Sequence, residues 1–486
     1  MHKRKLTGLG WMIVAATVCS LAWIQIPLAG ERIELGTRRE IFVDHYLIDK
    51  MEDVTLVLHH PRDEGPVFFF DKPWESTTPA YITLLADDGL LRAYYRGGYK
   101  RSDGKFSENT CYAQSKDGIT WEKPALGIID VNGSKDNNVV VDEAPFTHNF
   151  CPFIDKNPAA KPDQKYKAFG GTNKSGLVPF ISADGIHWKK MQEKPAITEG
   201  LLDSQNVPFW SELEKQYVCY FRSWTGTGER GYRSVSRATS ADFIHWTKAV
   251  EMSYGNTPHE HLYTQQTSPY FRAPHIYIAI GSRFVPHRQI MTEEQLQELK
   301  VDPSQHKGLS EPFLMSSRGG NVYDRTFMEA FIRPAIGLNH WSARTNYPSL
   351  NVVPTGKDQM SLYVNQDYAQ PTGHLERYSL RVDGFSSVKG PYKGGAFTTK
   401  AFTFTGKEFE INYSTSVAGE IRIAIQDENG KDIPGYSLLD SQELVGNEIA
   451  RTVSWDGNSD LSKLISKPVR LRIYLKDADL YSIRFK

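Results

Sequence analysis

The stretch Ser182-Ala-Asp184-Gly185-Ile-His-Trp188 recurs along this chain and decides its fold. Three similar stretches lie before and after it: Ser115-Lys-Asp117-Gly118-Ile-Thr-Trp121, Ser240-Ala-Asp242-Phe243-Ile-His-Trp246 and the weaker Ser317-Arg-Gly319-Gly320-Asn-Val-Tyr323. Asp-Gly between β-rich runs is typical of a tight hairpin, and the aromatic residue three positions later is expected to pack between neighbouring sheets. Internal repeats of this kind indicate that one structural unit is built several times over.

Each hairpin is preceded by a second pair of β-rich runs. In the third unit the four predicted strands are residues 205–209, 216–222, 232–239 and 245–250. Four strands in a meander form one blade of a β-propeller. We therefore predict an all-β protein with a five-bladed β-propeller, with six blades as the alternative. The early run 40–48, together with 54–59, is expected to complete the last blade and close the ring.

Two segments depart from the repeat. The fourth unit carries an insertion in which Thr292 and Gln295 form the pattern of a helix capping box, so residues 292–300 are predicted to be helical. After residue 383, short alternating segments separated by Gly, Asp and Asn turns predict a compact C-terminal β-sandwich. These segments are 402–405, 408–413, 420–426, 450–455 and 469–475. The predicted propeller thus covers residues 31–383 and the sandwich residues 384–486.

The first thirty residues have the layout of a secretory signal peptide. Lys3-Arg-Lys5 forms a basic start, residues 6–29 are mostly apolar, and Ala29-Gly30 provides small residues where a signal peptidase cuts. Glycine and proline interrupt the apolar stretch, which favours a cleaved signal over a membrane span. We expect a secreted or periplasmic protein with no membrane span after cleavage of residues 1–30.

Charge and cysteine content argue against two classes of protein. The chain has 57 Lys and Arg and 57 Asp and Glu; because three of the basic residues lie in the signal, the remainder has 54 and a net charge of −3. Nucleic-acid binding usually needs a basic face, so no nucleic-acid partner is expected. Cys111, Cys151 and Cys219 are too few for a disulfide framework, although a bridge between Cys111 and Cys151 stays open. Cys219 lies in an apolar run and is expected in the core.

Several stretches spread over the chain are similar to those of known propeller proteins. They are Phe42-Val-Asp44-His-Tyr-Leu-Ile-Asp49, Pro73-Trp-Glu75, Asp324-Arg-Thr-Phe-Met-Glu329-Ala-Phe-Ile-Arg-Pro334, Asn346-Tyr-Pro348, Met360-Ser-Leu-Tyr363 and Asp477-Ala-Asp-Leu-Tyr481. On these stretches the chain resembles the five-bladed propeller glycoside hydrolases of families 32, 43 and 68, and more closely a group of exported bacterial proteins labelled family-32-like. The resemblance implies a carbohydrate substrate and glycoside hydrolysis. The motifs Asn-Asp-Pro-Asn-Gly, Arg-Asp-Pro and Glu-Cys of invertases and fructanases are absent, so no catalytic residue is carried over from them.

Glycoside hydrolysis needs two carboxyl groups on opposite sides of the scissile bond. Because the innermost strands of a propeller converge on its axis, residues just before each inner strand are expected to ring a central pit. The acids in such places are Glu75, Asp203 and Glu260, and Glu329 lies in a connection that must return to the axis. We predict Glu329 as the general acid because its apolar neighbours should keep it protonated. Glu260 or Asp203 would be the base or nucleophile, and Glu75 would hold sugar hydroxyls.

Other polar residues in equivalent places are predicted to bind the substrate. They are His148 and Asn149 in the second blade, His261 beside Glu260, Asp324 in the connection to the last blade, and Asn346 in the fifth blade. Arg96, Arg222 and Arg283 stand at the ends of second strands, and guanidinium forks suit carboxylates and sulfates. The predicted substrate is therefore an oligo- or polysaccharide, and an anionic one is favoured.

Each of these assignments has a structural alternative. Glu75 and Asp203 could be carboxylates that stabilise turns. Glu329 could form a buried ion pair with a flanking arginine, and the three arginines could form salt bridges at the rim. His259 and His261 alternate as metal ligands do, but no third ligand is evident, so neither a metal nor another cofactor is predicted.

Two other functions compete with hydrolysis. One is a non-catalytic propeller that binds a glycan in the same pit, and the other is a surface interaction protein that uses the sandwich for adhesion. The number of carboxylates in the pit discriminates between them. Two or more that face each other favour hydrolysis, whereas one or none favours binding.

Overall fold

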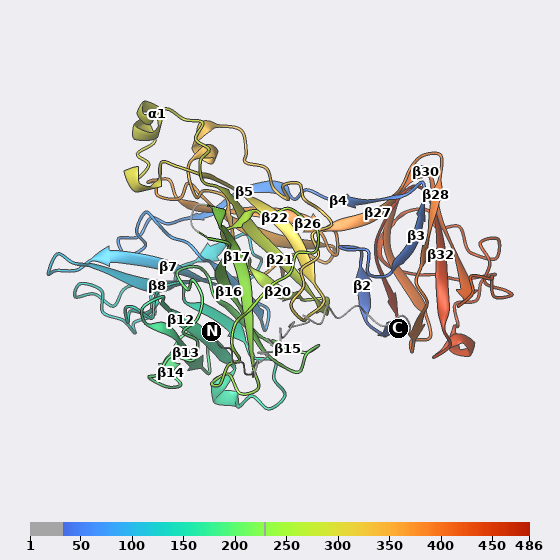
Figure 1. Cartoon of the computed structure of the whole chain (residues 1–486), viewed down its shortest axis with the longest axis horizontal. Helices are drawn as coiled ribbons and strands as arrows, with labels where there is room; N and C mark the ends of the chain where they lie inside the picture. Colours follow the sequence, from blue (N-terminus) through green and yellow to red (C-terminus); the bar gives the residue numbers. More distant parts are fainter. Residues whose placement is uncertain (1–32, 228–229) are drawn as a thin grey trace, which may run out of the picture.

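The computed structural model describes residues 33–227 and 230–486, and it is nearly all β. The predicted signal peptide lies outside the described residues. Figure 1 shows a propeller on the left and a smaller domain that contains the C-terminus on the right. Within the described part of the chain, no helix is long and apolar enough to cross a membrane.

Five sheets of successive strands form the propeller. Blade one contains β6 (Thr83–Asp87), β7 (Leu90–Lys100), β8 (Phe106–Ser115), β9 (Trp121–Glu122) and β10 (Val139–Val141). Blade two contains β11 (Cys151–Ile154), β12 (Tyr166–Thr172), β13 (Gly176–Ser182) and β14 (Lys189–Lys190). Blade three contains β15 (Val207–Ser211), β16 (Gln216–Thr225), β17 (Tyr232–Ser240) and β18 (Val250–Glu251).

Blade four contains β19 (His261–Leu262), β20 (Thr267–Tyr270), β21 (Ala273–Val285) and β22 (Leu309–Ser317). Blade five contains β23 (Tyr347–Pro348), β24 (Val353–Pro354), β25 (Gln359–Gln366), β26 (His374–Arg381) and, from the other end of the chain, β5 (Arg62–Phe69). Short 3₁₀ helices lie at η1 (Pro162–Gln164), η3 (Pro303–Gln305), η4 (Leu338–Trp341) and η5 (Ser462–Leu464). The predicted five-bladed propeller is confirmed, and the six-bladed alternative is wrong.

The ring is closed by strand β5. It pairs antiparallel with β26, so the last blade takes its outer strand from the N-terminal part of the chain. On the inner side, the amide of Leu350 donates to the carbonyl of Ile82 (2.8 Å), and the amide of Leu84 donates to the carbonyl of Leu350 (3.0 Å). Blades one and five are therefore joined at the axis.

The prediction that residues 40–48 and 54–59 close the ring is wrong. Strands β1 (Ile33–Gly36), β2 (Arg39–Ile41), β3 (Ile48–Glu52) and β4 (Thr55–Leu58) instead pair with strands of the C-terminal domain. The physical reason is burial, because Leu35, Phe42 and Leu47 all belong to the apolar core of that domain. The N-terminal segment is thus a structural part of the C-terminal domain.

The C-terminal domain is a ten-stranded sheet with one apolar core. Its other strands are β27 (Ser386–Gly390), β28 (Gly395–Thr399), β29 (Phe402–Phe404), β30 (Phe409–Asp427), β31 (Asn447–Thr452) and β32 (Val469–Phe485). The predicted segments 408–413 and 420–426 are one strand, β30, whose pairing with β32 shifts register between Thr415 and Glu420.

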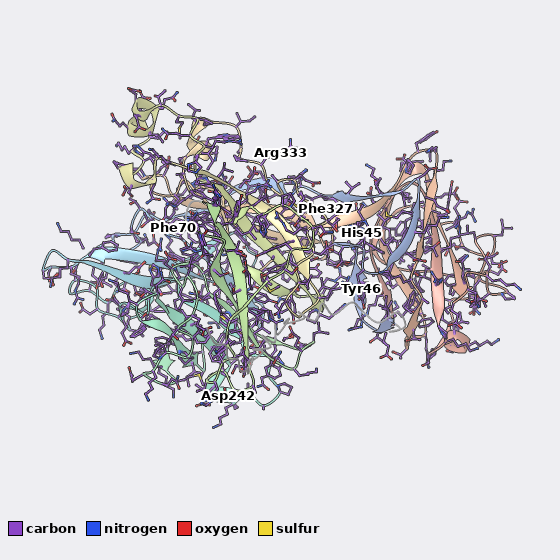
Figure 2. All side chains as sticks on the ribbon, viewed as in Figure 1. His45, Tyr46, Phe70, Asp242, Phe327 and Arg333 are labelled. Carbon is purple, nitrogen blue, oxygen red and sulfur yellow. The ribbon has the colours of Figure 1, made fainter. Side chains whose placement is uncertain are left out.

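The three strong copies of the repeat form the same hairpin. In the second copy, Asp184 Oδ1 accepts from the amides of Ile186 (2.8 Å) and His187 (2.9 Å), and Trp188 Nε1 donates to the carbonyl of Gly185 (3.1 Å). That carbonyl also accepts from Tyr94 Oη of the preceding blade (2.9 Å). The hairpins therefore hold neighbouring blades together, as the packing role of the aromatic residue predicted. Figure 2 shows Asp242, from the third copy, at the outer edge of the propeller.

Two local predictions are confirmed and one is not. Helix α1 (Glu293–Glu298) begins with the predicted capping box of Thr292 and Gln295. Cys219 is fully buried in the core. Cys111 and Cys151 are both free, so the disulfide that the sequence left open does not form.

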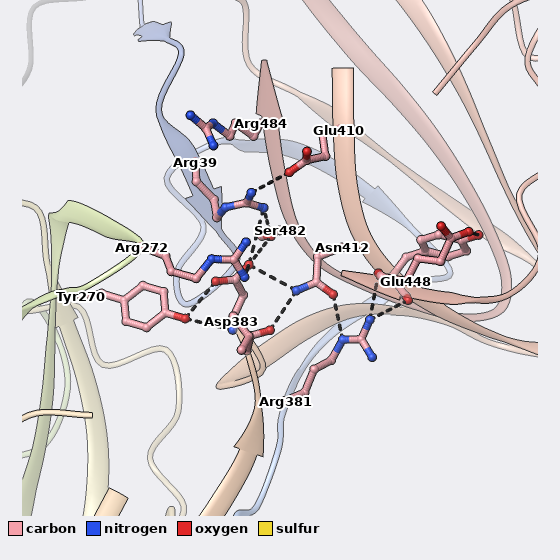
Figure 3. Close-up of polar contacts among 12 residues, drawn as sticks. Arg39, Tyr270, Arg272, Arg381, Asp383, Glu410, Asn412, Glu448, Ser482 and Arg484 are labelled. Carbon is pink, nitrogen blue, oxygen red and sulfur yellow. Dashed lines mark hydrogen bonds and ion pairs between the residues drawn. The ribbon is translucent and has the colours of Figure 1, made fainter. Parts of the chain in front are cut away.

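A buried carboxylate, Asp383, joins the two domains (Figure 3). Its partners come from both sides of the junction: Tyr270 (2.9 Å) and Arg272 (3.1 Å) of blade four, and Asn412 (3.2 Å), Ser482 (2.6 Å) and Arg39 (3.6 Å) of the C-terminal domain. The Asp383 side chain has no exposed surface. A charge buried at this depth is tolerated because arginines and hydrogen-bond donors surround it.

We predict that Asp383→Ala lowers the free energy of unfolding by about 3–5 kcal/mol, because the change removes the buried carboxylate that pairs with both Arg39 and Arg272. Urea unfolding followed by tryptophan fluorescence measures the effect. The control is Glu443→Ala, which removes an exposed ion pair with Arg422 and should cost less than about 1 kcal/mol. Equal stability of Asp383→Ala and the wild type would contradict this role.

Candidate functional site

Residues with left-handed backbone conformations gather where the inner strands begin. Tyr81, Asn149, Gln266 and Asn346 precede the inner strands of four blades, and their φ angles are 54°, 52°, 42° and 64°. A positive φ is uncommon for residues other than glycine, and such strained positions cluster at functional sites. This end of the propeller axis is therefore the candidate functional end.

Two buried amide side chains fill the axis at this level. Gln205 Nε2 donates to Thr83 Oγ1 (2.7 Å) and to the carbonyl of Tyr81 (3.2 Å), and Gln266 donates to Gln205. Gln205 also approaches Cys151 of blade two, with 3.6 Å between Nε2 and Sγ. These contacts tie blades one to four together and form a polar base for the residues above.

Four tyrosines pack together next to this base. The ring of Tyr347 stacks on Tyr263 (5.5 Å between centroids) and on Tyr81 (6.3 Å), and it lies 5.7 Å from the ring of Tyr368. Tyr81, Tyr347 and Tyr368 are buried, whereas Tyr263 is partly exposed. Tyr263 is thus the member of the cluster that solvent reaches most readily.

Four arginines surround the tyrosines. The guanidinium carbons of Arg222, Arg233 and Arg344 lie 5.2, 5.3 and 5.8 Å from the centre of the Tyr263 ring. Arg96 lies 5.2 Å from the ring of Tyr81. We call these eight residues the arginine–tyrosine site: Tyr81, Tyr263, Tyr347, Tyr368, Arg96, Arg222, Arg233 and Arg344.

Negative charge is scarce in the arginine–tyrosine site. Asp203 pairs with Arg222, and Glu108 pairs with Arg96 (3.3 Å) and with His148 (2.9 Å). Arg233 and Arg344 have no carboxylate partner among residues 33–227 and 230–486.

Several donors of this site are also unsatisfied. Arg222 Nε, Arg344 Nη1 and Asn149 Nδ2 are buried and have no hydrogen-bond acceptor in the described part of the chain. Buried donors without partners are rare in native proteins, and an unfilled ligand position is one explanation for them. The site therefore has the charge and the free donors to receive an anion.

The arginines change the ionisation of the partly exposed tyrosine. Burial favours the neutral phenol, but the charges of Arg344 and Arg222 outweigh it and lower the pKa of Tyr263. A hydrogen bond from Arg344 Nε to Tyr263 Oη (3.3 Å) acts in the same direction. For Tyr347 burial dominates and raises the pKa. Tyr263 is thus the tyrosine of this cluster whose phenolate is most accessible.

Exposed aromatic residues continue the site outward along the β16–β17 hairpin. Trp224 and Tyr232 are 40% and 37% exposed, which is unusual for such large apolar side chains. Tyr232 stacks on His259 (5.8 Å), and Arg233 lies 5.7 Å from the Trp224 ring. Flat aromatic surfaces beside charged groups suit a ring-shaped polar ligand.

The opposite end of the axis has a different character. Inner-strand residues of all five blades line a mostly apolar cavity of about 400 Å³ there, among them Leu84, Phe153, Phe209, Tyr270 and Val352. Lys156 and Glu212 are its titratable charged residues. This cavity offers few groups for acid–base chemistry, so the arginine–tyrosine site is the stronger candidate.

Several residues predicted from the sequence lie in or beside the arginine–tyrosine site. Arg96 and Arg222 are members, Asp203 pairs with Arg222, and Asn149 accepts a hydrogen bond from Arg96 (3.2 Å). His148 is linked to Arg96 through Glu108. His261 accepts from the amide of Arg233 (3.2 Å) at the outer side.

Two predicted residues are tied into a different network. Glu260 pairs with Arg283 (2.9 Å) and Arg325 (2.5 Å), and Arg283 also pairs with Glu311 (2.5 Å). The guanidinium of Arg283 is therefore saturated by two carboxylates. That Arg283 shares one binding surface with Arg96 and Arg222 stays a prediction.

The remaining predicted residues have local structural partners or none. Glu75 is fully buried and accepts from Tyr95 Oη (2.6 Å) and Lys123 Nζ (2.8 Å). Asp324 accepts from the amide of Thr326 (2.8 Å), and Asn346 donates to the carbonyl of His340 (3.0 Å). Glu329 is exposed, so its apolar neighbours in the sequence do not bury it as expected.

Sequence analysis missed six members of the site: Tyr81, Tyr263, Tyr347, Tyr368, Arg233 and Arg344. Tyr81, Tyr263 and Arg344 do precede inner strands, as the predicted site residues do, but they are not among the acids that glycoside hydrolysis requires. Arg233 pairs across the β16–β17 hairpin with Trp224, which no local pattern indicates. Among the described residues, no cluster of His, Cys, Asp and Glu is arranged to hold a metal.

Comparisons with known proteins give similarity in structure alone. No model of a protein family matches the sequence, and no curated protein sequence matches it. An N-acetylgalactosamine deacetylase from F. plautii is 14% identical, with a TM-score of 0.42 over 68% of this chain and 96% of that protein. A fructofuranosidase from Schwanniomyces occidentalis is 11% identical, with a TM-score of 0.38 over 88% of this chain and 98% of that protein.

A β-1,2-mannobiose phosphorylase from Listeria innocua is similar to the same extent. It is 9% identical, with a TM-score of 0.43 over 67% of this chain and 97% of that protein. All three TM-scores lie below 0.5. The function is therefore argued from the site itself.

We predict that Glu75→Gln lowers the free energy of unfolding by about 3 kcal/mol, because the change removes the fully buried carboxylate that pairs with Lys123, which then keeps the exposed Asp71 as its carboxylate partner. Thermal and urea unfolding measure the loss. The control is Glu122→Gln. Glu122 is exposed and directly precedes Lys123 in the chain, so this change should alter the free energy of unfolding by less than about 0.5 kcal/mol. A variant Glu75→Gln with normal stability but no glycan cleavage would instead support the sugar-binding role predicted from the sequence.

Proposed function

We propose that this protein is a carbohydrate-active enzyme that binds an anionic glycan at the arginine–tyrosine site and cleaves its glycosidic bonds. The observation that carries the proposal is the surplus of cations around Tyr263. Three guanidinium groups lie within 6 Å of its ring centre, and two of them have no carboxylate partner in the described residues.

The chemistry of these side chains favours an acidic sugar. Arginine binds carboxylate and sulfate groups through two parallel hydrogen bonds, and uronic acids and sulfated sugars carry these groups. Trp224 and Tyr232 add exposed aromatic surface on which sugar rings pack. Export of the protein through residues 1–30 would place it where such polysaccharides occur, and it stays a prediction.

Hydrolysis was the reaction predicted from the sequence, and non-catalytic binding was the alternative. Asp203 is a predicted carboxylate in contact with the site, Glu108 lies at its edge, and the predicted Glu260 lines a small cavity together with Arg233. All three are already paired with arginines. A low number of free carboxylates favours binding over hydrolysis by the two-carboxylate route, so substrate binding is the first property to test.

We expect the protein to bind oligogalacturonate more tightly than neutral cello-oligosaccharides of the same length. Arg233→Ala and Arg344→Ala should each weaken binding of oligogalacturonate at least about tenfold, because a hydrogen bond to a charged group contributes about 1.5–3 kcal/mol. Calorimetric titration at two salt concentrations measures the affinity. The affinity for the acidic ligand should fall as salt rises.

The control is Arg288→Ala, because Arg288 is exposed and lies outside the site. This change should leave the affinity unaltered. Equal affinity for acidic and neutral oligosaccharides would contradict the proposed function. Release of reducing ends from a panel of polysaccharides then separates an enzyme from a binding protein.

A further inference from the structure

We propose that Tyr263 is the catalytic base of a β-elimination that cleaves a 4-linked uronic acid residue of the glycan. This inference rests on the proposed function, since it needs an acidic sugar in the arginine–tyrosine site.

The position of Tyr263 suits a group that acts on a bound sugar. It lies between strands β19 and β20, next to the propeller axis, and it is the partly exposed tyrosine of the cluster. Its ring is held by Tyr347 on one face, and its hydroxyl accepts a hydrogen bond from Arg344 Nε (3.3 Å). A base must be fixed in this way to reach a particular proton.

The surroundings of Tyr263 favour its phenolate. The charged and titratable groups that face it are Arg222 and Arg233 from blade three, Arg344 from the connection before β23, and Tyr81 and Tyr347 from blades one and five. No carboxylate hydrogen-bonds to Tyr263 within the described residues, and Asp203 is engaged by Arg222. The lowered pKa of Tyr263 follows from this excess of positive charge.

The arginines also suit the substrate of an elimination. A uronate carboxylate held by Arg344 and Arg233 would lose much of its negative charge, which makes the neighbouring C5–H bond more acidic. As the proton leaves C5, negative charge develops on that carboxylate, and fixed guanidinium groups stabilise it. The same cations therefore bind the sugar and lower the barrier.

The site and the substrate together supply every group that the β-elimination needs. The Tyr263 phenolate takes the proton from C5, and the C5–H electron pair forms a C4=C5 double bond. The C4–O4 bond breaks, and O4 takes a proton from the Tyr263 phenol, which returns to the phenolate. The products are one fragment with a new reducing end and one with a 4,5-unsaturated uronate, and no water is consumed.

Elimination fits the carboxylate content of the site better than hydrolysis does. Hydrolysis by two carboxyl groups needs one that is protonated. Burial alone would raise the pKa of Glu108, but His148 and Arg96 outweigh burial and lower it, so this carboxyl is ionised at neutral pH. Asp203 is paired with Arg222. Elimination needs one base and several cations, and the site holds both.

The experiment incubates the full protein with polygalacturonate, alginate and hyaluronan, which contain 4-linked uronic acids. Two products are followed together, the ultraviolet absorbance of the conjugated double bond and the number of reducing ends. We expect at least one polymer to give both in equal amounts. Tyr263→Phe should reduce the rate at least about a hundredfold and keep the affinity for the oligosaccharide, because a phenyl ring packs alike but cannot take a proton.

The control is Tyr378→Phe, a buried tyrosine of blade five outside the site, which should keep the wild-type rate. A pH profile adds a signature that a structural role would not produce. The rate should rise with pH as Tyr263 ionises, and Arg344→Gln should move that rise to higher pH, because the loss of a positive charge raises the pKa of the phenol.

Four results would overturn the inference. Cleavage with reducing ends but no unsaturated product would exclude elimination and leave the proposed function standing. Binding of the polyuronates without any cleavage would exclude it as well and favour the binding protein. A Tyr263→Phe variant that still eliminates would remove Tyr263 as the base. Neither binding nor cleavage of acidic polymers would refute the proposed function together with this inference.

Discussion

The pairing of strand β5 with β26 is the constraint on which the rest of the propeller depends. Without it, β26 would present an unpaired edge, and exposed edges of this kind recruit other strands. The pairing also brings blade one against blade five, where Leu350 bonds to the inner strand of blade one. Tyr81 and Arg96 of blade one then lie against Tyr347 and Tyr368 of blade five. The arginine–tyrosine site therefore exists only when the ring is closed.

The fold holds the positively charged arginines of the arginine–tyrosine site close together, although like charges repel. Burial and the nearby charges of Arg222 and Arg344 lower the pKa of Arg233, so these two cations disfavour the charged form of Arg233. The closed ring supplies the rigidity that keeps them together, and an anionic ligand would relieve the repulsion. Perturbed ionisation of several neighbouring groups is characteristic of functional sites. The strained backbone at Tyr81 and Arg344, with φ of 54° and 57°, is consistent with the same conclusion.

The repeat shows how one motif serves two purposes. Three copies keep the same tight hairpin, and in two of them its carbonyl also accepts from a tyrosine of the preceding blade: Gly118 from Tyr363 (2.7 Å) and Gly185 from Tyr94 (2.9 Å). In the fourth copy Ser316 and Asp324 pair antiparallel across a longer turn, and Arg318 of that turn pairs with Glu40 (2.9 Å) and Asp44 (2.8 Å) of the N-terminal segment. Figure 2 shows His45 and Tyr46 of that segment between the propeller and the C-terminal domain. Together with Asp383, this contact joins the two domains.

The sequence by itself determined the features that depend on neighbouring residues: the repeated hairpins, the propeller built from them, the capping box of helix α1 and the β-rich C-terminal domain. It favoured five blades but left six open. It did not determine which strand closes the ring, because residues 40–48 and 62–69 both have a strand-like pattern and only competition for the C-terminal core separates them. Nor did it show that Arg233 and Arg344 converge on Tyr263, or that Glu75 is saturated by Lys123 and Tyr95. Those facts were decided by the tertiary structure, because residues from different blades meet at the axis only after a ring of five sheets has closed.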